Sequence, residues 1–386
     1  MEKNKGWRYV MNYPKVKKNI LLNPGPATTT DTVKYAQVIP DICPREKEFV
    51  SIMKELGDDL VKIVHGNLEE YIAVLFCGSG TINIDVCISS LVPDGKKVLI
   101  VNNGAYSARA VEVCKCYHIN YIELKLSITE PADTMKIEEL LKKDKDIAVV
   151  YACHHETGTG VLNPIREMGA IVHQYNGIFV VDTTSSYAMI PIDIEKDNLD
   201  FIMASAQKGL MSMTGLSFVI GKKDLIERSR NYKTRSYYTN LYMQYDYIKN
   251  KGEMRFIPPV QTIYATKQAL EEYNKEGEQN KWERHQRTWN EIYIGLDNLG
   301  FKTTIKKGNQ SKLVVSVEYP KDENWKFDRI HDYCLERGFT IYPGKISDMN
   351  TFRLCSLGAI DVEDIKAFFE VFEEALRKCG VGIPVN

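Results

Sequence analysis

The chain has 386 residues, of which 44% are hydrophobic and 26% are charged, as expected for a globular protein with one large domain and a smaller one. Its 50 basic and 51 acidic residues nearly cancel, so no overall field favours nucleic acid or an anionic membrane. The longest apolar runs are too short to span a bilayer. Nine cysteines without a Cys-x-x-Cys pair predict reduced thiols in a cytoplasmic protein and no metal site.

The N-terminus is basic but has no apolar segment. Residues 1–20 are therefore expected to form a basic extension and not a signal peptide. We expect a large domain, with an N-terminal arm, over residues 21–275. A smaller domain is expected over residues 276–386.

Residues 70–222 alternate between short apolar runs and helical patterns. The runs are apolar throughout, as is typical of strands that helices cover on both faces. This alternation predicts an α/β fold with a mostly parallel sheet between helices. The expected strands are Ile72–Cys77, Lys97–Val101, Ile147–Ala152, Ile178–Asp182, Phe201–Ala204 and Leu216–Ile220, and the helices between them include Thr81–Leu91, Ser107–Cys116 and Ile165–Tyr175.

The pattern changes after the last of these strands. Arg230–Tyr247 is rich in tyrosine and lacks a clean period, so we expect an irregular connection there. A helix over Thr262–Asn274 follows a pair of prolines. Beyond about residue 300 the pattern predicts a small α+β domain, with strands Leu313–Glu318 and Phe352–Leu357 and helices Phe327–Glu336 and Val362–Lys378.

Three segments with reactive or polar side chains lie at the ends of predicted strands. Cys77-Gly78-Ser79-Gly80-Thr81 leads into a helix, where glycines, hydroxyls and free N–H groups could hold a phosphate. Asp182 ends an apolar strand, and Lys208 follows another and precedes a glycine. Taken singly, a tight turn, a turn cap and a surface lysine explain them as well. Because all three fall at one edge of one sheet, they favour a cofactor with a phosphate, a pyridinium and an aldehyde.

In its motifs the chain resembles the class V group of fold-type I aminotransferases, which depend on pyridoxal phosphate (PLP). The resemblance runs from Leu21-Leu22-Asn23-Pro24-Gly25-Pro26 to Phe352-Arg353-Leu354. Within this class the chain is most similar to the transaminases that act on 2-aminoethylphosphonate and pyruvate. The resemblance implies a homodimer in which Lys208 binds the cofactor aldehyde and moves the proton, and Asp182 pairs with the ring nitrogen. It also implies that Ser79, Gly80 and Thr81 bind the phosphate, Tyr106 stacks on the ring, Thr157 lies near the ring hydroxyl, Gln207 contacts the cofactor and Arg353 binds an anionic end of the substrate.

Two positions depart from the pattern of this class. The class usually has a threonine before the Pro-Pro pair, which reaches the phosphate of the neighbouring subunit; here the residue is Ile257. We expect Arg255 to replace that contact. The class often has histidine before Arg-x-x-x-Phe, whereas Pro44 precedes Arg45, a candidate substrate-binding residue.

Other functions remain open at this stage. An aminotransferase of the alanine:glyoxylate or serine:pyruvate type would use the same machinery with a different pocket. A desulfurase would need a mobile catalytic cysteine, but Cys334 and Cys355 lie in apolar contexts. A non-catalytic protein of the PLP fold is disfavoured by Lys208 and Asp182. A nucleotide-binding oxidoreductase is disfavoured because the glycine fingerprint is missing.

Overall fold

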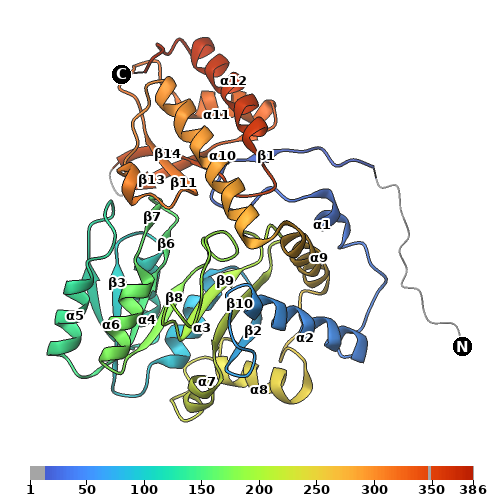
Figure 1. Ribbon diagram of the computed structural model, residues 1–386, viewed down its shortest axis with the longest axis vertical. Coiled ribbons are helices and arrows are strands. Elements are labelled where there is room, and N and C mark those ends of the chain that lie inside the picture. Colours follow the sequence, from blue (N-terminus) through green and yellow to red (C-terminus); the bar gives the residue numbers. More distant parts are fainter. Residues whose placement is uncertain (1–13, 347–348, 386) are drawn as a thin grey trace, which may run out of the picture.

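The computed structural model describes residues 14–346 and 349–385 (Figure 1). Most of the expected basic extension, residues 1–20, lies outside the described residues. The chain folds around a seven-stranded sheet in the lower part of Figure 1 and a three-stranded sheet in the upper part. The long helix α10 (Glu278–Asn298) runs between the two parts. In the described part of the chain, no helix is both long and apolar enough to cross a bilayer.

The large sheet has the strand order β2-β10-β9-β8-β5-β3-β4. Neighbouring strands from β9 to β4 are parallel, and only β10 (Leu216–Lys222) runs antiparallel to its two neighbours. Because β2 reverses direction again, its carboxyl end lies at the same edge as those of the parallel strands. The α/β fold with a mostly parallel sheet is confirmed. The other strands are β2 (Tyr71–Cys77), β3 (Lys97–Asn102), β4 (Asn120–Lys125), β5 (Ile147–Cys153), β8 (Ile178–Asp182) and β9 (Phe201–Ser205).

Alternate residues of the strands pack into two apolar cores on opposite faces of the sheet. In β3, for example, Val98 and Ile100 belong to one core and Leu99 and Val101 to the other. Each such side chain stabilises the fold by about 1.5–3 kcal/mol, so burial on both faces fixes the register. One core includes α3 (Thr81–Leu91), α4 (Ser107–Cys116), α7 (Lys223–Ser229) and α8 (Leu241–Lys251). The other includes α2 (Lys47–Lys62), α5 (Thr134–Lys143), α6 (Ile165–Gln174) and α9 (Val260–Glu276).

The C-terminal part is built on an antiparallel sheet in the order β11-β14-β13. Helices α10, α11 and α12 pack with it around an aromatic core that contains Trp289, Phe352 and Phe372. At the N-terminus, β1 (Ile20–Leu21) pairs in parallel with β12 (Phe339–Thr340), so this arm also joins the C-terminal part. The division into two domains near residue 275 stays a prediction. The remaining bounds are β11 (Val314–Glu318), β13 (Tyr342–Ile346), β14 (Met349–Cys355), α11 (Phe327–Glu336) and α12 (Val362–Cys379).

The expectation of an irregular segment over Arg230–Tyr247 is wrong in its second half, because α8 begins at Leu241. The Asn240 side chain accepts the Met243 N–H at 2.9 Å and caps this helix. Its buried face combines apolar residues with Gln244, whose amide donates to the Leu75 carbonyl at 2.8 Å on the outer edge of β2. A buried glutamine and many partly exposed tyrosines hid the helical period.

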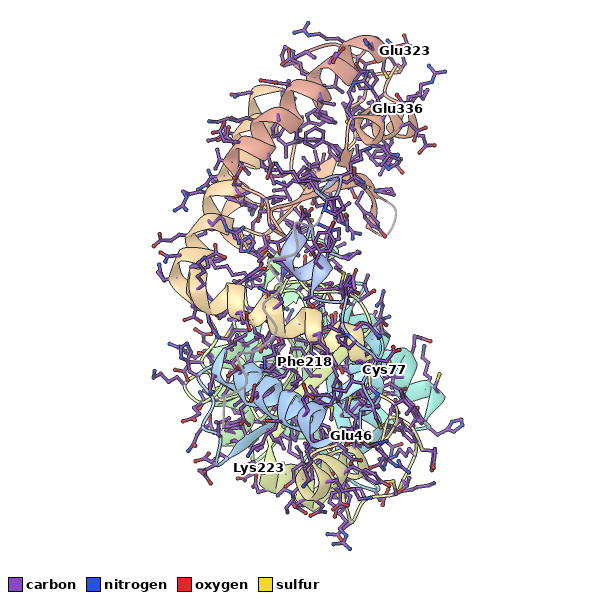
Figure 2. The ribbon with its side chains drawn as sticks, turned by 90° about the vertical axis from the view of Figure 1, so that its right-hand side faces the viewer. Glu46, Cys77, Phe218, Lys223, Glu323 and Glu336 are labelled. Atoms are coloured by element: carbon purple, nitrogen blue, oxygen red, sulfur yellow. The ribbon has the colours of Figure 1, made fainter. Side chains whose placement is uncertain are left out.

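The carboxyl edge of the large sheet faces the C-terminal part of the molecule. In the side view of Figure 2, Cys77, the last residue of β2, lies on the side of the sheet toward the upper part. Lys223, which follows the antiparallel β10, lies at the opposite side. The loops that follow the parallel strands therefore lie between the two parts of the molecule.

Candidate active site

A cavity of about 170 Å³ opens at the carboxyl edge of the large sheet. Loops that follow β2, β3, β5, β8 and β9 supply its walls, as expected for ligand sites in open α/β sheets. Of the residues predicted from sequence, Ser79, Gly80, Thr81, Tyr106, Thr157, Asp182, Gln207 and Lys208 line this cavity. The structure therefore brings eight predicted residues, from five separate segments, to one place.

Lys208 is almost completely buried, at 8% exposure. Burial lowers the pKa of its amine, and the negative charge of Asp182 opposes the shift. A Cβ at Gly25 would lie 3.0 Å from Cγ of Lys208, so the lysine stem packs directly on the N-terminal arm. Its Nζ lies 5.3 Å from the centre of the Tyr106 ring. A poorly hydrated amine with a lowered pKa is a usable nucleophile and proton acceptor.

Asp182 ends β8 as a buried carboxylate. One oxygen accepts the Thr184 N–H at 2.8 Å, and the other accepts the Tyr151 hydroxyl at 3.4 Å. No lysine or arginine of the described residues forms an ion pair with it. The Thr184 contact is the turn cap that the sequence also allowed. A buried carboxylate without a cationic partner is suited to a ligand that carries a positive N–H group.

Glu156 connects the loops that follow β3 and β5. Its Oε1 accepts the N–H of Tyr106 at 3.1 Å and of Ser107 at 2.7 Å, and thereby caps α4. Burial raises the pKa of Glu156, and these N–H groups oppose the rise. A Cβ at Gly104 would lie 2.4 Å from the Glu156 carboxyl, so glycine at position 104 allows the close approach of this loop to the carboxylate. One carboxylate thus positions Tyr106 and, through the chain, Thr157.

Thr157 belongs to a buried hydrogen-bond chain. It donates to the Ser185 hydroxyl at 2.7 Å, and Ser185 donates to the His155 carbonyl at 3.0 Å. The His155 ring contacts Ser185 O through Nδ1 at 3.1 Å and Ser311 Oγ through Nε2 at 2.9 Å. Burial lowers the pKa of His155 to about 4, so the ring is neutral near pH 7. This chain fixes the wall of the cavity without adding charge.

The loop before α3 forms the other end of the cavity. A Cβ at Gly80 would lie 2.9 Å from Cγ2 of Thr184, so glycine allows the close approach of this loop. Arg109 donates from Nη1 to Thr81 Oγ1 at 2.9 Å, and its guanidinium lies 4.6 Å from the centre of the Tyr106 ring. A helix N-terminus, hydroxyls and a guanidinium together make an anion site.

These residues fit PLP, the cofactor that the resemblance implies. The loop before α3 with Arg109 suits a phosphate, Asp182 suits a protonated ring nitrogen, and Lys208 suits an aldehyde. Buried polar atoms normally have partners, yet three oxygens in or beside this cavity have none. They are Thr184 Oγ1, Ser205 Oγ and Gln207 Oε1.

Arg353 approaches the site from the C-terminal part. It is 7% exposed, and its neighbours on β14, Phe352 and Leu354, are buried in the aromatic core. Among the described residues, no carboxylate forms an ion pair with it and its Nε has no hydrogen-bond partner. Arg353 does not line the cavity itself. Burial raises the pKa of Tyr106 and the charge of Arg353 opposes this most strongly, as expected for a guanidinium nearby.

Arg45 and Arg255 are not brought to the cavity of their own chain. Arg45 forms an ion pair with Glu253 at 2.6 Å and donates to the Met254 carbonyl at 2.7 Å. Arg255 donates to the Tyr237 carbonyl at 2.7 Å. The roles expected for these arginines stay predictions that require a second subunit.

Sequence reasoning missed two residues that build the site, Arg109 and Glu156. Arg109 follows Tyr106 by three residues on a helix, so both share one face and could have been found by spacing alone. Glu156 precedes Thr157 directly, but no spacing signals that it caps α4 across the loop.

The two cysteines considered for a desulfurase do not provide a reactive thiolate. Burial raises the pKa of Cys334 and of Cys355 to about 12, so both remain thiols. Across residues 14–346 and 349–385, no group of three or more His, Cys, Asp or Glu side chains could hold a metal ion.

Comparison with known proteins identifies relatives over nearly the whole chain. The class-V aminotransferase family matches residues 30–354. A 2-aminoethylphosphonate–pyruvate transaminase of Cupriavidus necator is 34% identical over 94% of this chain and 96% of its own length. A bifunctional phosphonoacetaldehyde hydrolase/aminoethylphosphonate transaminase of Clostridioides difficile is 34% identical over 93% of this chain, which spans 56% of that protein. Among solved structures, an alanine–glyoxylate aminotransferase of Nostoc sp. has the same fold, with a TM-score of 0.86, 22% identity, and coverage of 98% and 100% of the two chains.

Asp182→Asn tests whether the buried carboxylate does more than cap a turn. The amide keeps the shape and the Thr184 contact but removes the charge that would hold a ring proton. We expect the single-turnover rate of the amine half-reaction to fall by about a hundredfold or more. Tyr151→Phe, which removes the 3.4 Å hydrogen bond to Asp182 and the 4.0 Å contact with Cys153 Sγ, is the control and should change the rate little. An unchanged rate in Asp182→Asn would reduce this residue to a turn cap.

Proposed function

Because the chain belongs to the class-V aminotransferase family, we propose that it transfers the amino group between 2-aminoethylphosphonate and pyruvate, with phosphonoacetaldehyde and alanine as the other pair. As a member of this family it is a PLP-dependent aminotransferase. The choice of substrates is supported by the relatives at 34% identity, whose names state that reaction.

The observation that carries the proposal is the buried Arg353, which has no anionic partner among the described residues. A buried charge that lacks a partner is costly, and an anionic ligand would offset this cost. The planar guanidinium can donate two parallel hydrogen bonds to either a phosphonate or a carboxylate. Amino donor and 2-oxo acid bind in separate halves of the cycle, so Arg353 can serve both anions in turn.

The residues of the cavity have separate tasks in this proposal. When bound, PLP supplies a ring that withdraws electrons from the substrate carbon. Nζ of Lys208 accepts the proton from the amine-bearing carbon of the donor and later delivers a proton to the keto carbon of pyruvate. Asp182 keeps the ring nitrogen protonated, and Tyr106 covers the ring. Ser79, Gly80, Thr81 and Arg109 hold the phosphate, while Thr157 and Gln207 contact the rest of the cofactor.

A homodimer is part of the proposal. An exposed apolar patch, formed by Tyr237, Tyr238 and Ile257 around Phe256, lies beside Arg255, whose guanidinium lies 4.4 Å from the centre of the Tyr237 ring. Ile257 alone is 69% exposed. A second copy that covered this patch would bring Arg255, and Arg45 next to it, toward a neighbouring site. Nine unpaired cysteines fit a cytoplasmic location.

A panel of amino donors tests the proposed function. Turnover of 2-aminoethylphosphonate by the wild-type enzyme, with pyruvate as acceptor, is compared with that of β-alanine, L-serine and L-alanine. We expect the phosphonate to exceed β-alanine, a carboxylate of similar length, because the dianion binds a buried guanidinium more strongly. A clear preference for an α-amino acid would favour an alanine:glyoxylate or serine:pyruvate type of enzyme. If none of the donors changed the visible absorption band of the bound cofactor, the protein would be a binding protein without turnover.

Arg353→Lys should weaken both half-reactions. Lysine keeps the charge but cannot make the two parallel bonds, at a cost on the order of 2–5 kcal/mol if the contact is buried. The measurement is kcat/KM for the phosphonate and for pyruvate in separate half-reactions. Arg337→Lys on the surface of α11 is the matched control. If only one half-reaction changed, a different residue would have to bind the other anion.

Arg109→Gln and Arg255→Gln separate two sources of positive charge for the cofactor phosphate. Arg109 contacts Thr81 within the chain, so its loss should weaken PLP binding about tenfold to hundredfold while leaving pyridoxal, which lacks the phosphate, unaffected. Arg255→Gln should have this effect only if the protein is a dimer by light scattering. An Arg255→Gln variant with unchanged PLP affinity would leave Arg109 as the residue that offsets Ile257. An equal loss for PLP and pyridoxal would contradict a phosphate contact.

A further inference from the structure

Helix α10 carries a buried lysine that the proposed reaction does not use. Lys281 is 1% exposed, and its Nζ donates to the Gly209 carbonyl at 2.6 Å. Among the described residues no carboxylate lies within ion-pair distance of this amine, which also lies 5.0 Å from the centre of the Tyr273 ring. Burial lowers its pKa to about 7. An apolar side chain of the same length would fill this space without the cost of burying an amine, so its presence points to a different role.

The carbonyl that Lys281 binds belongs to the turn that presents Lys208. Gly209 also packs closely on the Tyr187 backbone, because a Cβ there would lie 1.9 Å from the Tyr187 carbonyl oxygen. Three successive carbonyls of the turn each accept a hydrogen bond, and the donor of the third bond lies on helix α10. The pairs are Ala27 N–H to Gln207 at 2.9 Å, Met211 N–H to Lys208 at 2.9 Å and Lys281 Nζ to Gly209 at 2.6 Å.

The same face of α10 also contacts the segment that follows Arg353, over residues 356–360. Arg284 and His285 lie three and four residues after Lys281, so the three side chains are neighbours on the helix. Nδ1 of His285 lies 2.7 Å from the Ser356 carbonyl. Arg284 donates to the carbonyls of Gly358 at 2.9 Å and Ile360 at 3.1 Å, just beyond β14. About one helical turn of α10 therefore contacts both the Lys208 turn and the end of the Arg353 strand.

We propose that Lys281 is a positioning residue that sets the distance between the Lys208 amine and the Arg353 guanidinium, and with it the length of the amino donor. The inference rests on the proposed function, because it assumes that the charged end of the donor binds Arg353. A donor held at both ends must match this distance, and a misplacement of about 1 Å can lower turnover a hundredfold. Helix α10 is suited to this task because it runs from one part of the molecule to the other (Figure 1).

The test compares Lys281→Met, which keeps the length but removes the donor, with Lys281→Arg, which keeps a cationic donor. Arg287→Met, on the exposed side of α10, is the matched control. Each holoenzyme is assayed with 2-aminoethylphosphonate and with 3-aminopropylphosphonate, one methylene longer. In Lys281→Met we expect kcat/KM for the shorter donor to fall about tenfold and its advantage over the longer donor to shrink at least threefold. Lys281→Arg should restore part of that advantage.

If Lys281 only stabilised the fold, Lys281→Met would lower the unfolding midpoint and reduce turnover of both donors equally. The positioning role predicts neither result. Replacing a buried amine by methionine should leave the unfolding midpoint near that of the wild type, since lost desolvation cost and lost hydrogen bond nearly cancel. Equal losses for both donors, or a midpoint lowered together with activity, would overturn the proposal. So would an unchanged ratio of the two donors in Lys281→Met.

Hydrogen exchange gives a readout that needs no substrate. In the holoenzyme of Lys281→Met, amides of residues 206–212 should exchange faster than in the wild type and in Arg287→Met. If this loss of protection is found but neither phosphonate is a donor, the proposed function fails while the contact with the Lys208 turn stands. Unchanged protection over residues 206–212 would contradict the positioning role itself.

Discussion

The burial of the Lys208 amine is the constraint on which the rest of the site depends. An amine kept from water favours its neutral form, and Asp182 prevents the shift from becoming extreme without approaching closely enough to form an ion pair. Such a balance needs polar groups on all sides and little solvent. The loops at the carboxyl edge of the sheet supply both, because five strands end there together. Gly25 and Gly209 then let the backbone pack tightly on either side of the lysine turn.

The C-terminal part also buries a basic side chain, but its role is to supply a positive charge and not a neutral amine. Arg353 is a buried guanidinium, and in the described part of the chain no carboxylate forms an ion pair with it. The large sheet therefore offers a buried carboxylate and a nucleophilic amine, and the small sheet offers a buried cation. A substrate that has an amine at one end and an anionic group at the other complements both.

Much of the fold could be predicted from the sequence because burial on both faces leaves a clear pattern. Ile178–Asp182 was predicted with its bounds, and Thr81–Leu91 likewise. The residues at the strand ends could be predicted as well, since parallel strands bring them to one edge. Contacts between loops could not. Glu156 and Lys281 act on backbone groups that are 49 and 72 residues away in sequence, and no periodicity reports such pairs.

The close fit of Gly104 against Glu156 affects which substitutions can occur at these two positions during evolution. A side chain at position 104 would overlap the carboxyl group, so Glu156 would have to leave its present position. A change at position 156 is also restricted, because a smaller residue there leaves the N–H groups of Tyr106 and Ser107 without an acceptor. A change at either position thus disturbs the contacts of Glu156, and the two positions are expected to vary together among descendants of this chain.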